Sequence, residues 1–401
     1  MNQIIFHIDV NSAYLSWTAV EQLKNGAEVD LREVPSIIGG NQESRHGVVL
    51  AKSVPAKKFG IVTGEPVANA LRKCPGLLMA PPNHKMYSDY SKQLMAFLST
   101  YTPDIEQVSV DECYMDYTGI AFRYDSPIEA ANEIKDAVYE KFGFTVNIGI
   151  SVNHLLAKMA SDFQKPNKVH TLFPEEVPLK MWPLPVSELY MAGKSSVAIL
   201  QKLEIRTIGE LANADPELLE LHLKSHGRTL WEFANGIQSE RIVRDRPENK
   251  GIGNSTTLPK DAETEEEAKK VLLWLAETVG GRLRKESVKA KMISVEIKYS
   301  TFQTVSHQKQ VTRATNADKM IYEIACELFK ELWNGQPIRL LGIRTSKLVD
   351  ENEPEQMSIF DFQEEVGKHK VQDEKHQKLN KALDAIRKKY GDDAIFRGSL
   401  K

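Results

Sequence analysis

The sequence predicts a chain of several domains of the α/β (α+β) class, in which helices and strands are mixed. Strand and helix periodicities alternate over residues 4–150, prolines cluster at 174–185, and further helix and strand patterns follow over 263–333. The length of 401 residues also exceeds what a single core usually serves. We therefore predict two to four domains.

The composition excludes several classes of protein. Hydrophobic residues make up 41% of the chain, too many for a disordered protein, and the net charge of −3 excludes a small, wholly basic nucleic-acid clip. Apolar stretches such as 271–276 are far shorter than the roughly 18 residues of a membrane span, and residues 1–10 show no signal peptide. Three cysteines are too few for a disulfide framework. We expect a cytoplasmic protein without membrane contact.

The first 150 residues carry the clearest local patterns. A buried strand is expected over 4–10, with Asp9 at its end. Positions 144, 146, 148 and 150 are all apolar, and this alternation predicts a half-buried strand. The other expected elements are helices at 12–22, 86–100 and 127–142, a loop-rich segment at 34–74, and two short strands within 105–116.

Short helices are expected beyond the prolines, over residues 187–235. Breaks in this helical pattern are predicted at Gly193, at Gly209 and at Asp215, which precedes a proline. Residues 241–254 contain few apolar side chains and are expected to form a linker.

A basic region follows the expected linker. Helices are predicted near 263–286 and 315–333, with a strand at 292–299. Residues 281–347 contain 13 Lys or Arg and 6 Asp or Glu, a net charge of +7. This concentration favours nucleic-acid binding, although an ordinary solvated surface is also compatible with it. Residues 350–401 are charged and include an amphipathic pattern near 376–390.

Acidic residues stand at the ends of two predicted strands. Asp9 ends the first, and Asp111 and Glu112 lie within the 105–116 segment. Carboxylate oxygens suit Mg²⁺, and two ions about 3.5–4 Å apart can activate a hydroxyl and stabilise the leaving oxygen in phosphoryl transfer. Consecutive strand residues point to opposite faces, so Asp111 and Glu112 can converge only at a turn or a twisted strand end. Such carboxylates are also ordinary turn residues, and spacing alone does not decide.

Longer motifs around these residues are more specific. Segments 6–14 (FHIDVNSAY) and 109–116 (SVDECYMD) strongly resemble the two catalytic motifs of the Y-family DNA polymerases, the translesion enzymes. Segments 149–153, 157–161 and 165–167 agree with the same family, in its order and at its spacings. The resemblance runs from about residue 1 to residue 360.

The resemblance implies a right-hand polymerase architecture, with a palm, small fingers, a helical thumb and a C-terminal α/β little-finger domain. Because these modules use nearly the whole chain, no proofreading domain is expected. The implied boundaries are a palm at 1–10 and 75–165, fingers at 11–74, a thumb with a helix-hairpin-helix at 166–240, a linker at 241–254, a little finger at 255–349, and a tail with a clamp-binding peptide and a terminal helix at 350–401.

The resemblance also implies roles at the catalytic centre. Asp9, Asp111 and Glu112 would bind two Mg²⁺ ions, with the backbone carbonyl of Val10 as a candidate further ligand. A primer 3′-hydroxyl would attack the α-phosphate of a deoxynucleoside triphosphate and release pyrophosphate. Lys165 matches the family's triphosphate-binding lysine, whose charge suits a polyanionic leaving group, although Lys-Pro-Asn is also a plausible turn after a helix.

Two further residues match nucleotide-binding positions. Tyr14 matches the steric gate, the aromatic residue that excludes a 2′-hydroxyl, although ordinary core packing would also place an aromatic residue on the first helix. In the fingers, Val54 and Lys57 replace a tyrosine and an arginine that usually contact the triphosphate. Lys57 keeps the charge but not the bidentate geometry of arginine. This departure resembles the catalytic subunit of DNA polymerase V, so the polymerase IV and V subfamilies both stay open.

The expected thumb contains a DNA-binding element. Gly193, Lys194 and Ser195 resemble part of a helix-hairpin-helix, in which backbone N–H groups hold a DNA phosphate without reading its sequence. The usual first glycine is Met191 here, so we expect a less tight hairpin. A nucleotide-binding P-loop is rejected, because Glu188 stands where that motif needs a glycine.

A short peptide near the C-terminus resembles the motif by which bacterial polymerases bind the sliding clamp. It comprises residues 356–360, in which Gln356 would hydrogen-bond the rim of a pocket while Ile359 and Phe360 fill an apolar cleft. A chance tail sequence is the alternative. Its position directly after the expected little finger favours clamp binding.

Together these features predict a low-fidelity translesion DNA polymerase of low processivity. The expected partners are primer-template DNA, deoxynucleoside triphosphates and the sliding clamp, with the enzyme monomeric and associated with a bacterial nucleoid. One alternative is a catalytically inactive DNA-binding relative that recruits repair partners, which the complete set of acidic residues disfavours. A nuclease using the same metal ions is a weaker alternative.

Overall fold

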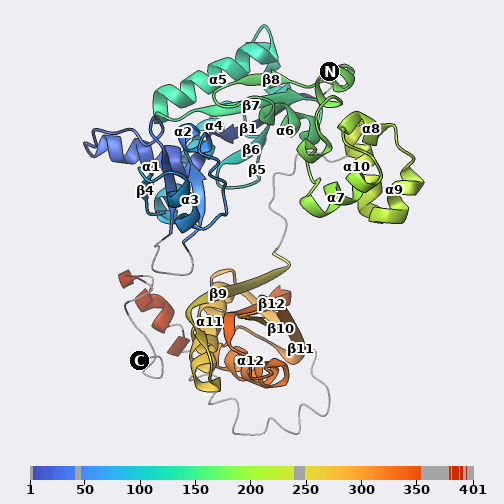
Figure 1. Ribbon diagram of the computed structural model, residues 1–401. Coiled ribbons are helices and arrows are strands. Elements are labelled where there is room, and N and C mark those ends of the chain that lie inside the picture. Colours follow the sequence, from blue (N-terminus) through green and yellow to red (C-terminus); the bar gives the residue numbers. More distant parts are fainter. Residues whose placement is uncertain are drawn as a thin grey trace. The chain divides into compact units, whose positions relative to one another are not determined.

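The computed structural model describes residues 3–40, 47–238, 249–353 and, near the C-terminus, 379–380, 382–387, 389–391 and 394 (Figure 1). These residues form two compact units, one ending at residue 238 and the other starting at residue 249. Each unit has its own sheets, helices and core, which confirms the predicted α/β (α+β) multidomain class. Among the described residues, no helix is long and apolar enough to cross a membrane.

The first unit is built on a five-stranded sheet with the order β5-β6-β1-β7-β8. The central strand β1 pairs antiparallel with both β6 and β7. In the first pairing, Asp9 lies directly opposite Glu112. The strands are β1 (Ile5–Val10), β5 (Ile105–Gln107), β6 (Glu112–Asp116), β7 (Val146–Ser151) and β8 (Val169–Thr171).

Three helices cover one face of this sheet and enclose the main core. Phe6, Ile8 and Val10 of β1 point into this core, as the two-residue period of a strand requires. Ser126 caps the N-terminus of the third helix by accepting the N–H of Glu129, and the helix has the predicted bounds 127–142. The helices are α1 (Ala13–Lys24), α4 (His84–Leu98) and α5 (Pro127–Phe142).

A further helix, α6 (His154–Asp162), packs on β1 and β7 and joins a second apolar cluster. The prediction of a half-buried strand near residues 144–150 was therefore wrong, since all six residues of β7 are buried. A Cβ at Gly149 would lie 2.0 Å from the carbonyl oxygen of Ala157, so only glycine allows this close approach. Asn147, also fully buried, is satisfied by hydrogen bonds to backbone oxygens. The alternation of apolar residues in β7 predicted burial of one strand face, but the structure buries both faces.

A small three-stranded sheet, β3-β2-β4, occupies much of the segment predicted as loop-rich. The strands and helices of this segment are three to seven residues long, which is too short for periodicity to reveal them. Their side chains form a separate small core. The elements are β2 (Ser36–Gly39), β3 (Val49–Lys52), α2 (Val54–Lys57), α3 (Val67–Lys73) and β4 (Leu78–Ala80).

Short helices complete the first unit, as the sequence predicts. Asp215 caps one of them, with a proline at its first turn, which fits the predicted break there. Gly209, however, lies inside a helix and against Trp182, so the break predicted at this position was wrong. The helices are α7 (Lys194–Lys202), α8 (Ile208–Ala212), α9 (Pro216–Leu223) and α10 (Ser225–Ala234), preceded by single turns at Thr118–Arg123, Pro174–Glu176, Val177–Met181 and Val186–Glu188.

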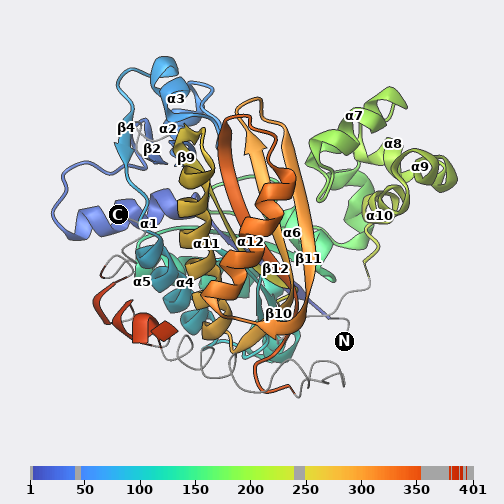
Figure 2. The same cartoon turned by 90° about the horizontal axis from the view of Figure 1, so that it is seen from below.

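The second unit is a four-stranded antiparallel sheet with the order β11-β10-β12-β9, covered on one face by two helices (Figure 2). Ile293, Val295 and Ile297 of β10, which includes the strand predicted at 292–299, are buried beneath these helices. The elements are β9 (Gly251–Ala262), α11 (Glu265–Lys285), β10 (Val288–Tyr299), β11 (Thr304–Thr315), α12 (Asp318–Leu332) and β12 (Ile338–Asp350).

The strands of this unit extend beyond the predicted boundaries. β9 begins at Gly251, inside the range 241–254 expected to be a linker, and β12 ends one residue after 349. β9, β11 and β12 were not predicted as strands. β11 has mostly exposed residues, so it lacks the alternation that reveals a half-buried strand.

The described residues near the C-terminus belong to the second unit. Residues 379–380, 382–387 and 389–390 are helical, consistent with the predicted amphipathic pattern, and Leu383 is buried. Asp384 accepts two hydrogen bonds from Arg284 of α11, at 2.6 and 3.0 Å. Arg387 forms an ion pair of 2.7 Å with Glu277 of the same helix. This part of the expected tail is therefore packed on the domain.

Candidate active site

The candidate site lies where β1 ends and β6 begins. Asp9 is the next-to-last residue of β1, and the register of the two strands sets it beside Glu112. Because side chains alternate along a strand, His7 and Asp9 share the face opposite the main core. Their side chains lie under α6, and that of Asp9 is only 13% exposed. The sequence thus directs two acidic side chains to one enclosed sheet face.

Asp111 occupies the turn that leads into β6. The N–H of Val10 donates to the Asp111 carbonyl at 3.0 Å, which fixes this turn against β1, and Ser109 donates its hydroxyl to the Asp111 carboxylate at 2.6 Å. Burial raises the pKa of Asp111, and the negative charges of Asp9 and Glu112 raise it further against the effect of Ser109. Asp111 is therefore within electrostatic range of the other two acids, in the turn next to Glu112.

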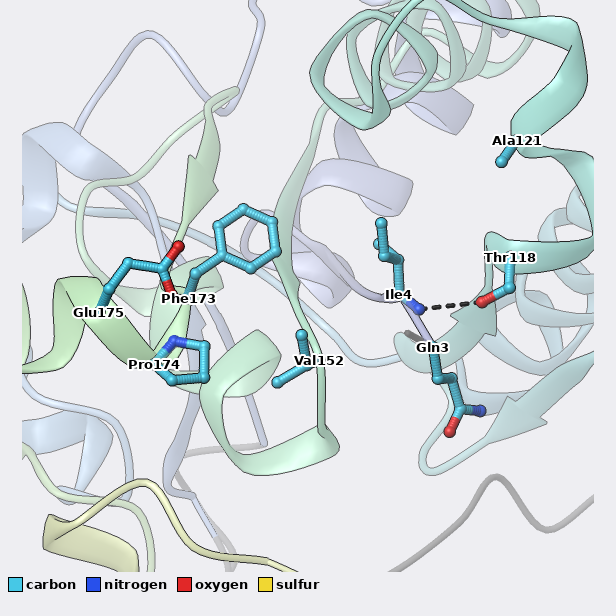
Figure 3. A pocket seen from close by; sticks show the side chains of 8 residues that line it. All are labelled: Gln3, Ile4, Thr118, Ala121, Val152, Phe173, Pro174 and Glu175. Atoms are coloured by element: carbon cyan, nitrogen blue, oxygen red, sulfur yellow. Dashed lines mark hydrogen bonds between the residues drawn. The ribbon is translucent and has the colours of Figure 1, made fainter. Parts of the chain in front are cut away.

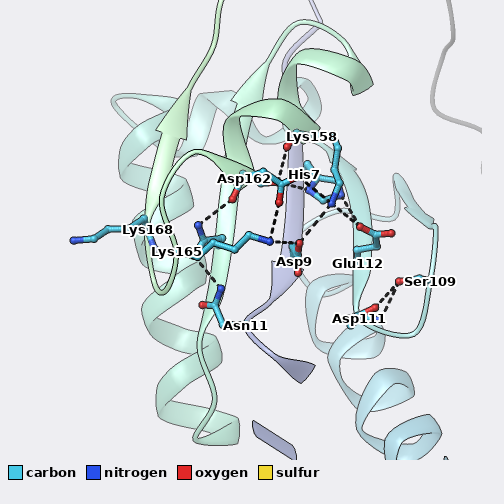
Figure 4. A network of polar contacts seen from close by, with 12 residues as sticks. His7, Asp9, Asn11, Ser109, Asp111, Glu112, Lys158, Asp162, Lys165 and Lys168 are labelled. Atoms are coloured by element: carbon cyan, nitrogen blue, oxygen red, sulfur yellow. Dashed lines mark hydrogen bonds and ion pairs between the residues drawn. The ribbon is translucent and has the colours of Figure 1, made fainter. Parts of the chain in front are cut away.

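Two lysines pair with these acids (Figure 4). Lys158 Nζ lies 2.9 Å from Oε2 of Glu112 and 3.5 Å from Oδ2 of Asp9. Lys165 Nζ lies 2.6 Å from Oδ2 of Asp9 and 2.8 Å from Oδ1 of Asp162. Burial alone would lower the pKa of Lys165, but Asp9 and Asp162 outweigh it and raise this pKa. The site is an alternating network of opposite charges.

His7 supports Glu112 from the interior. Its Nε2 lies 3.3 Å from Oε2 of Glu112, and its Nδ1 is 2.8 Å from the hydroxyl oxygen of Ser161 on α6. Burial lowers the pKa of His7, so the imidazole is neutral at neutral pH. Contacts with His7 and then Lys158 lower the pKa of Glu112 to about 2 despite its burial. Glu112 is therefore ionised at all physiological pH values.

Buried amides fix the backbone around Lys165. Asn11 accepts the N–H of Asn167 at 2.9 Å, and Asn147 donates to the carbonyl of Gln164 at 2.7 Å and accepts the N–H of Lys168 at 3.2 Å. These bonds tie the Lys-Pro-Asn segment to the end of β1 and to β7. The proximity of Lys165 to Asp9 thus follows from backbone anchoring as well as from charge.

The residues present fit a hard divalent cation, although they are not arranged around one. Among the described residues, no three His, Cys, Asp or Glu side chains form a ready metal-ion site. The donors at the site are carboxylate oxygens, which are the ligands that Mg²⁺ prefers. The ammonium groups of Lys158 and Lys165 lie at Asp9 and Glu112 instead.

Tyr14 of α1 stands beside the acids. Its ring stacks on Tyr87 of α4, with ring centroids 4.3 Å apart and planes at 8°, and His84 packs edge-on against it. Burial raises the pKa of Tyr14, and the charge of Asp111 raises it further. Stacking therefore holds the ring rigidly within electrostatic range of Asp111.

The remaining predicted contacts lie elsewhere in the first unit. Lys57 is the exposed last residue of α2. Gly193 is the N-cap of α7 with open space around it, and Lys194 and Ser195 form the first turn. Met191 has a φ of 69°, the left-handed conformation that a glycine would adopt without strain. Met191 therefore adopts the backbone conformation that the glycine of the predicted hairpin would adopt. Gln356, Ile359 and Phe360 lie outside the described residues.

A groove of about 750 Å³ is separate from this network (Figure 3). It is lined by residues at the opposite end of β1, including Ile4, and by Thr118, Val152 and Phe173. The Ile4 N–H donates to the Thr118 hydroxyl within it. Ile4 lies five positions before Asp9 along the extended strand, about 16 Å away, so this groove is not part of the candidate site.

The second unit has a polar hollow of about 880 Å³ on the sheet face that α11 and α12 leave uncovered. The strand registers align Gly253, Arg344, Ser294 and Gln308 in one row across all four strands. These residues line the hollow. Small and polar side chains make this face broad, shallow and accessible to a large polar partner.

Comparisons with known proteins agree with this geometry. Residues 8–162 match the impB/mucB/samB family, and residues 249–359 match the C-terminal domain of that family. DNA polymerase IV of Clostridium acetobutylicum is 48% identical over 400 residues, covering 100% of this chain and 98% of the relative. The chain belongs to the Y family of DNA polymerases. DNA polymerase IV 1 of Bacillus subtilis is 36% identical over 99% of this chain and 93% of its own.

A solved structure supports the fold. A Y-family DNA polymerase chimera of Dbh and Dpo4 matches with a TM-score of 0.74 and 23% identity, covering 86% of this chain and 99% of the chimera. The palm, fingers, thumb and little-finger architecture predicted from the motifs is thereby confirmed. This Y-family polymerase is a DNA-directed DNA polymerase of translesion synthesis, it acts on DNA and deoxynucleoside triphosphates, and enzymes of its family use divalent metal ions.

Sequence reasoning assigned no role to His7, Lys158 or Asp162, although the first two lie within the family motifs. Two signals pointed to them. His7 shares the strand face of Asp9, and Lys158 and Asp162 are four residues apart on one helix, which makes them neighbours. Their proximity to Glu112 depends on the pairing of distant segments, which no local pattern contains.

Proposed function

We propose that this polymerase adds deoxynucleotides by a two-metal-ion mechanism in which Asp9, Asp111 and Glu112 hold two Mg²⁺ ions. The observation that carries this proposal is the direct pairing of Asp9 with Glu112 across β1 and β6, with Asp111 in the adjoining turn. The backbone carbonyl of Val10 would be a further ligand. Such ions, when bound, activate the primer 3′-hydroxyl and stabilise the departing pyrophosphate. The low pKa of Glu112 keeps it ready as an anionic ligand.

Lys165 binds the triphosphate of the incoming nucleotide in this proposal. Its Nζ already lies at an anionic position, between Asp9 and Asp162, and its backbone is anchored by Asn11. Phosphate oxygens offer the ammonium group an alternative anionic partner. Lys57, exposed at the end of α2, contributes a second charge from the fingers.

Tyr14 acts as the steric gate against ribonucleotides. The stacking on Tyr87 supports this role, because a gate that excludes one hydroxyl group must not move aside. Its proximity to Asp111 places the ring near the proposed metal ligands.

DNA is held by two surfaces in this proposal. In the thumb, backbone N–H groups of Lys194 and Ser195, beside the uncapped Gly193, bind a phosphate. In the little finger, the uncovered sheet face with Arg344 and Ser294 follows the DNA backbone. Neither contact reads base sequence, which suits an enzyme that acts at any damaged site.

Residues 356–360 bind the sliding clamp, and the enzyme works as a monomer at the bacterial nucleoid. The proposed clamp peptide lies at the end of the matched C-terminal family domain, which covers residues 249–359. Deleting 356–360 is expected to abolish stimulation by the clamp and to leave distributive synthesis intact. Equal loss of both would instead indicate a structural role for the peptide.

Primer extension tests the mechanism as a whole. The full chain is incubated with Mg²⁺, a primed template and nucleotides, on undamaged DNA and opposite an abasic site or a bulky guanine adduct. We expect extension on all three, complete loss on chelation of the metal, and no release of mononucleotides when nucleotides are omitted. DNA binding without extension would instead support an inactive recruiting relative, and mononucleotide release would support a nuclease.

A further inference from the structure

The ammonium group of Lys158 bridges two of the proposed metal ligands. From α6 it reaches Oε2 of Glu112 at 2.9 Å and Oδ2 of Asp9 at 3.5 Å (Figure 4). The Lys158 side chain is only 16% exposed, whereas that of Lys165 is 32% exposed. Lys165 contacts Asp9 but pairs on its other side with Asp162. Lys158 is thus the more enclosed cation, and it touches carboxylates of both strands.

The charge of Lys158 offsets the repulsion between Asp9 and Glu112, which the strand register places opposite each other. Two carboxylates opposite each other on adjacent strands repel, and burial strengthens that repulsion. The ammonium group of Lys158 lies within ion-pair distance of both carboxylates, and its side chain is largely enclosed. Its positive charge therefore offsets the repulsion between the two acids.

We propose that Lys158 is a positioning residue that serves as a built-in counter-cation, which a divalent ion must displace from Asp9 and Glu112. This inference rests on the proposed function of these carboxylates as metal ligands. A divalent ion and an ammonium group cannot occupy the same carboxylate oxygens, because their charges repel at such short range. Metal binding is then an exchange of cations, and the acids are never left without a positive partner.

The exchange needs a second position for the displaced ammonium group, and α6 supplies one. Asp162 lies one turn after Lys158, with its Oδ2 3.5 Å from Nζ, and its side chain is 47% exposed. Lysine has a flexible stem, so its ammonium group can move toward Asp162 without displacing the helix. Asp162 would thus hold Lys158 away from the metal ligands once a metal ion is bound.

Mn²⁺ binding to the full-length protein, without DNA or nucleotide, tests this exchange. Free Mn²⁺ is measured by electron paramagnetic resonance. Lys158→Met removes the competing charge and should tighten Mn²⁺ binding by about tenfold, whereas Lys158→Arg should stay within about twofold of the wild type. Lys168→Met is the matched control, since Lys168 points away from the acids in Figure 4, and it should also stay within about twofold.

Asp162→Asn provides a second test, because it should weaken Mn²⁺ binding, whereas Lys158→Met should tighten it. Without Asp162 the ammonium group stays between Asp9 and Glu112, so Mn²⁺ binding should weaken by about threefold. A merely structural role for Lys158 would weaken binding in both variants. The proposal is overturned if Lys158→Met binds Mn²⁺ as weakly as the wild type or more weakly, including the case in which neither binds.

The result is distinguishable from failure of the proposed function. If Asp9→Asn loses Mn²⁺ binding but Lys158→Met leaves it unchanged, the carboxylates are metal ligands and Lys158 is not their competitor. If Asp9→Asn binds Mn²⁺ like the wild type and still extends primers, the assignment of the metal ligands itself is wrong. Thermal unfolding in a chelator should show a lower midpoint for Lys158→Met, because Asp9 and Glu112 then lose the cation that contacts both of them.

Discussion

The main sheets of the two units differ in whether helices pack on one face or on both faces. In both units, helices cover one face of the sheet and close a core. In the first unit α6 also covers the other face, so His7, Asp9 and Glu112 are enclosed among fixed partners. In the second unit α11 and α12 cover only one face, and on the other face Ser294, Gln308 and Arg344 line a polar hollow.

In the proposed mechanism, this difference separates two tasks of one enzyme. Enclosed charges are oriented by their neighbours, which suits phosphoryl transfer, where small displacements of a ligand cost much of the rate. Polar groups on an exposed sheet face can adjust to the regular backbone of DNA, and each contributes only a small part of the binding free energy. Substitutions in the two regions should therefore differ in size and in kind.

The largest effect is expected from Asp111→Ala, in the enclosed region. Loss of a proposed metal ligand should reduce nucleotide incorporation by about a thousandfold. Single-turnover primer extension measures the rate, with DNA affinity determined separately. If DNA affinity fell and the rate per bound complex did not, Asp111 would belong with the contacts of the uncovered face.

Tyr14→Ala should change selectivity more than rate. Without the ring stacked on Tyr87, a 2′-hydroxyl is no longer excluded, and discrimination against ribonucleotides should fall by about a hundredfold. The measurement is the ratio of kcat/KM for deoxyribonucleotide and ribonucleotide. Tyr14→Phe keeps the ring and should retain discrimination against ribonucleotides. Unchanged selectivity in Tyr14→Ala would mean that the residue serves only to pack the core.

Arg344→Ala probes the uncovered face and should act through DNA affinity alone. Losing one phosphate contact should lower the slope of log affinity against log salt by about 1, with a similar effect on all sequences. Fluorescence anisotropy at several salt concentrations measures this slope. Glu296→Ala, on the same face of β10, removes a charge of opposite sign and should raise affinity. A change confined to the catalytic rate would contradict the contrast between the faces.

The smallest effect is expected from a backbone change outside both sheets. Met191 holds a φ of 69°, and Met191→Gly should relieve strain of about 1 kcal/mol in the free energy of unfolding. Urea denaturation of the full chain measures the stability of the first unit. DNA affinity should not change, because the proposed thumb contacts come from the backbone of α7. Destabilisation would mean that packing of the methionine side chain outweighs the strain.

The sequence predicted the elements that have a strong local signature. The helix Pro127–Phe142 has a full apolar stripe, a serine cap and a glycine after its last turn, and its bounds were predicted correctly. β11 and the small sheet of the fingers were missed, because exposed or four-residue strands leave no usable alternation. Local patterns also cannot report that a second helix covers β7, which depends on Gly149 meeting α6.

The acidic residues of the candidate site were predicted from motifs, and the structure sets Asp9 opposite Glu112, with Asp111 in the turn before β6. Their neighbours were not predicted. Lys158 reaches Glu112 across 46 positions of sequence, and the contact exists only because α6 lies over β1. The register that sets Asp9 against Glu112 is likewise a property of paired strands. Charge networks between distant segments are visible only once the chain is folded.

The ion pairs between the last described helical residues and α11 bear on how the second unit can be produced in isolation. A fragment cut after β12 would keep all four strands and both covering helices. It would nevertheless lose Asp384 and Arg387. Arg284 would then lack the carboxylate of Asp384, to which it donates two hydrogen bonds, and the buried Glu277 would lack its ion pair with Arg387. Expression boundaries drawn from the sheet alone would thus yield a weakened domain, and a stable fragment should include Asp384 and Arg387.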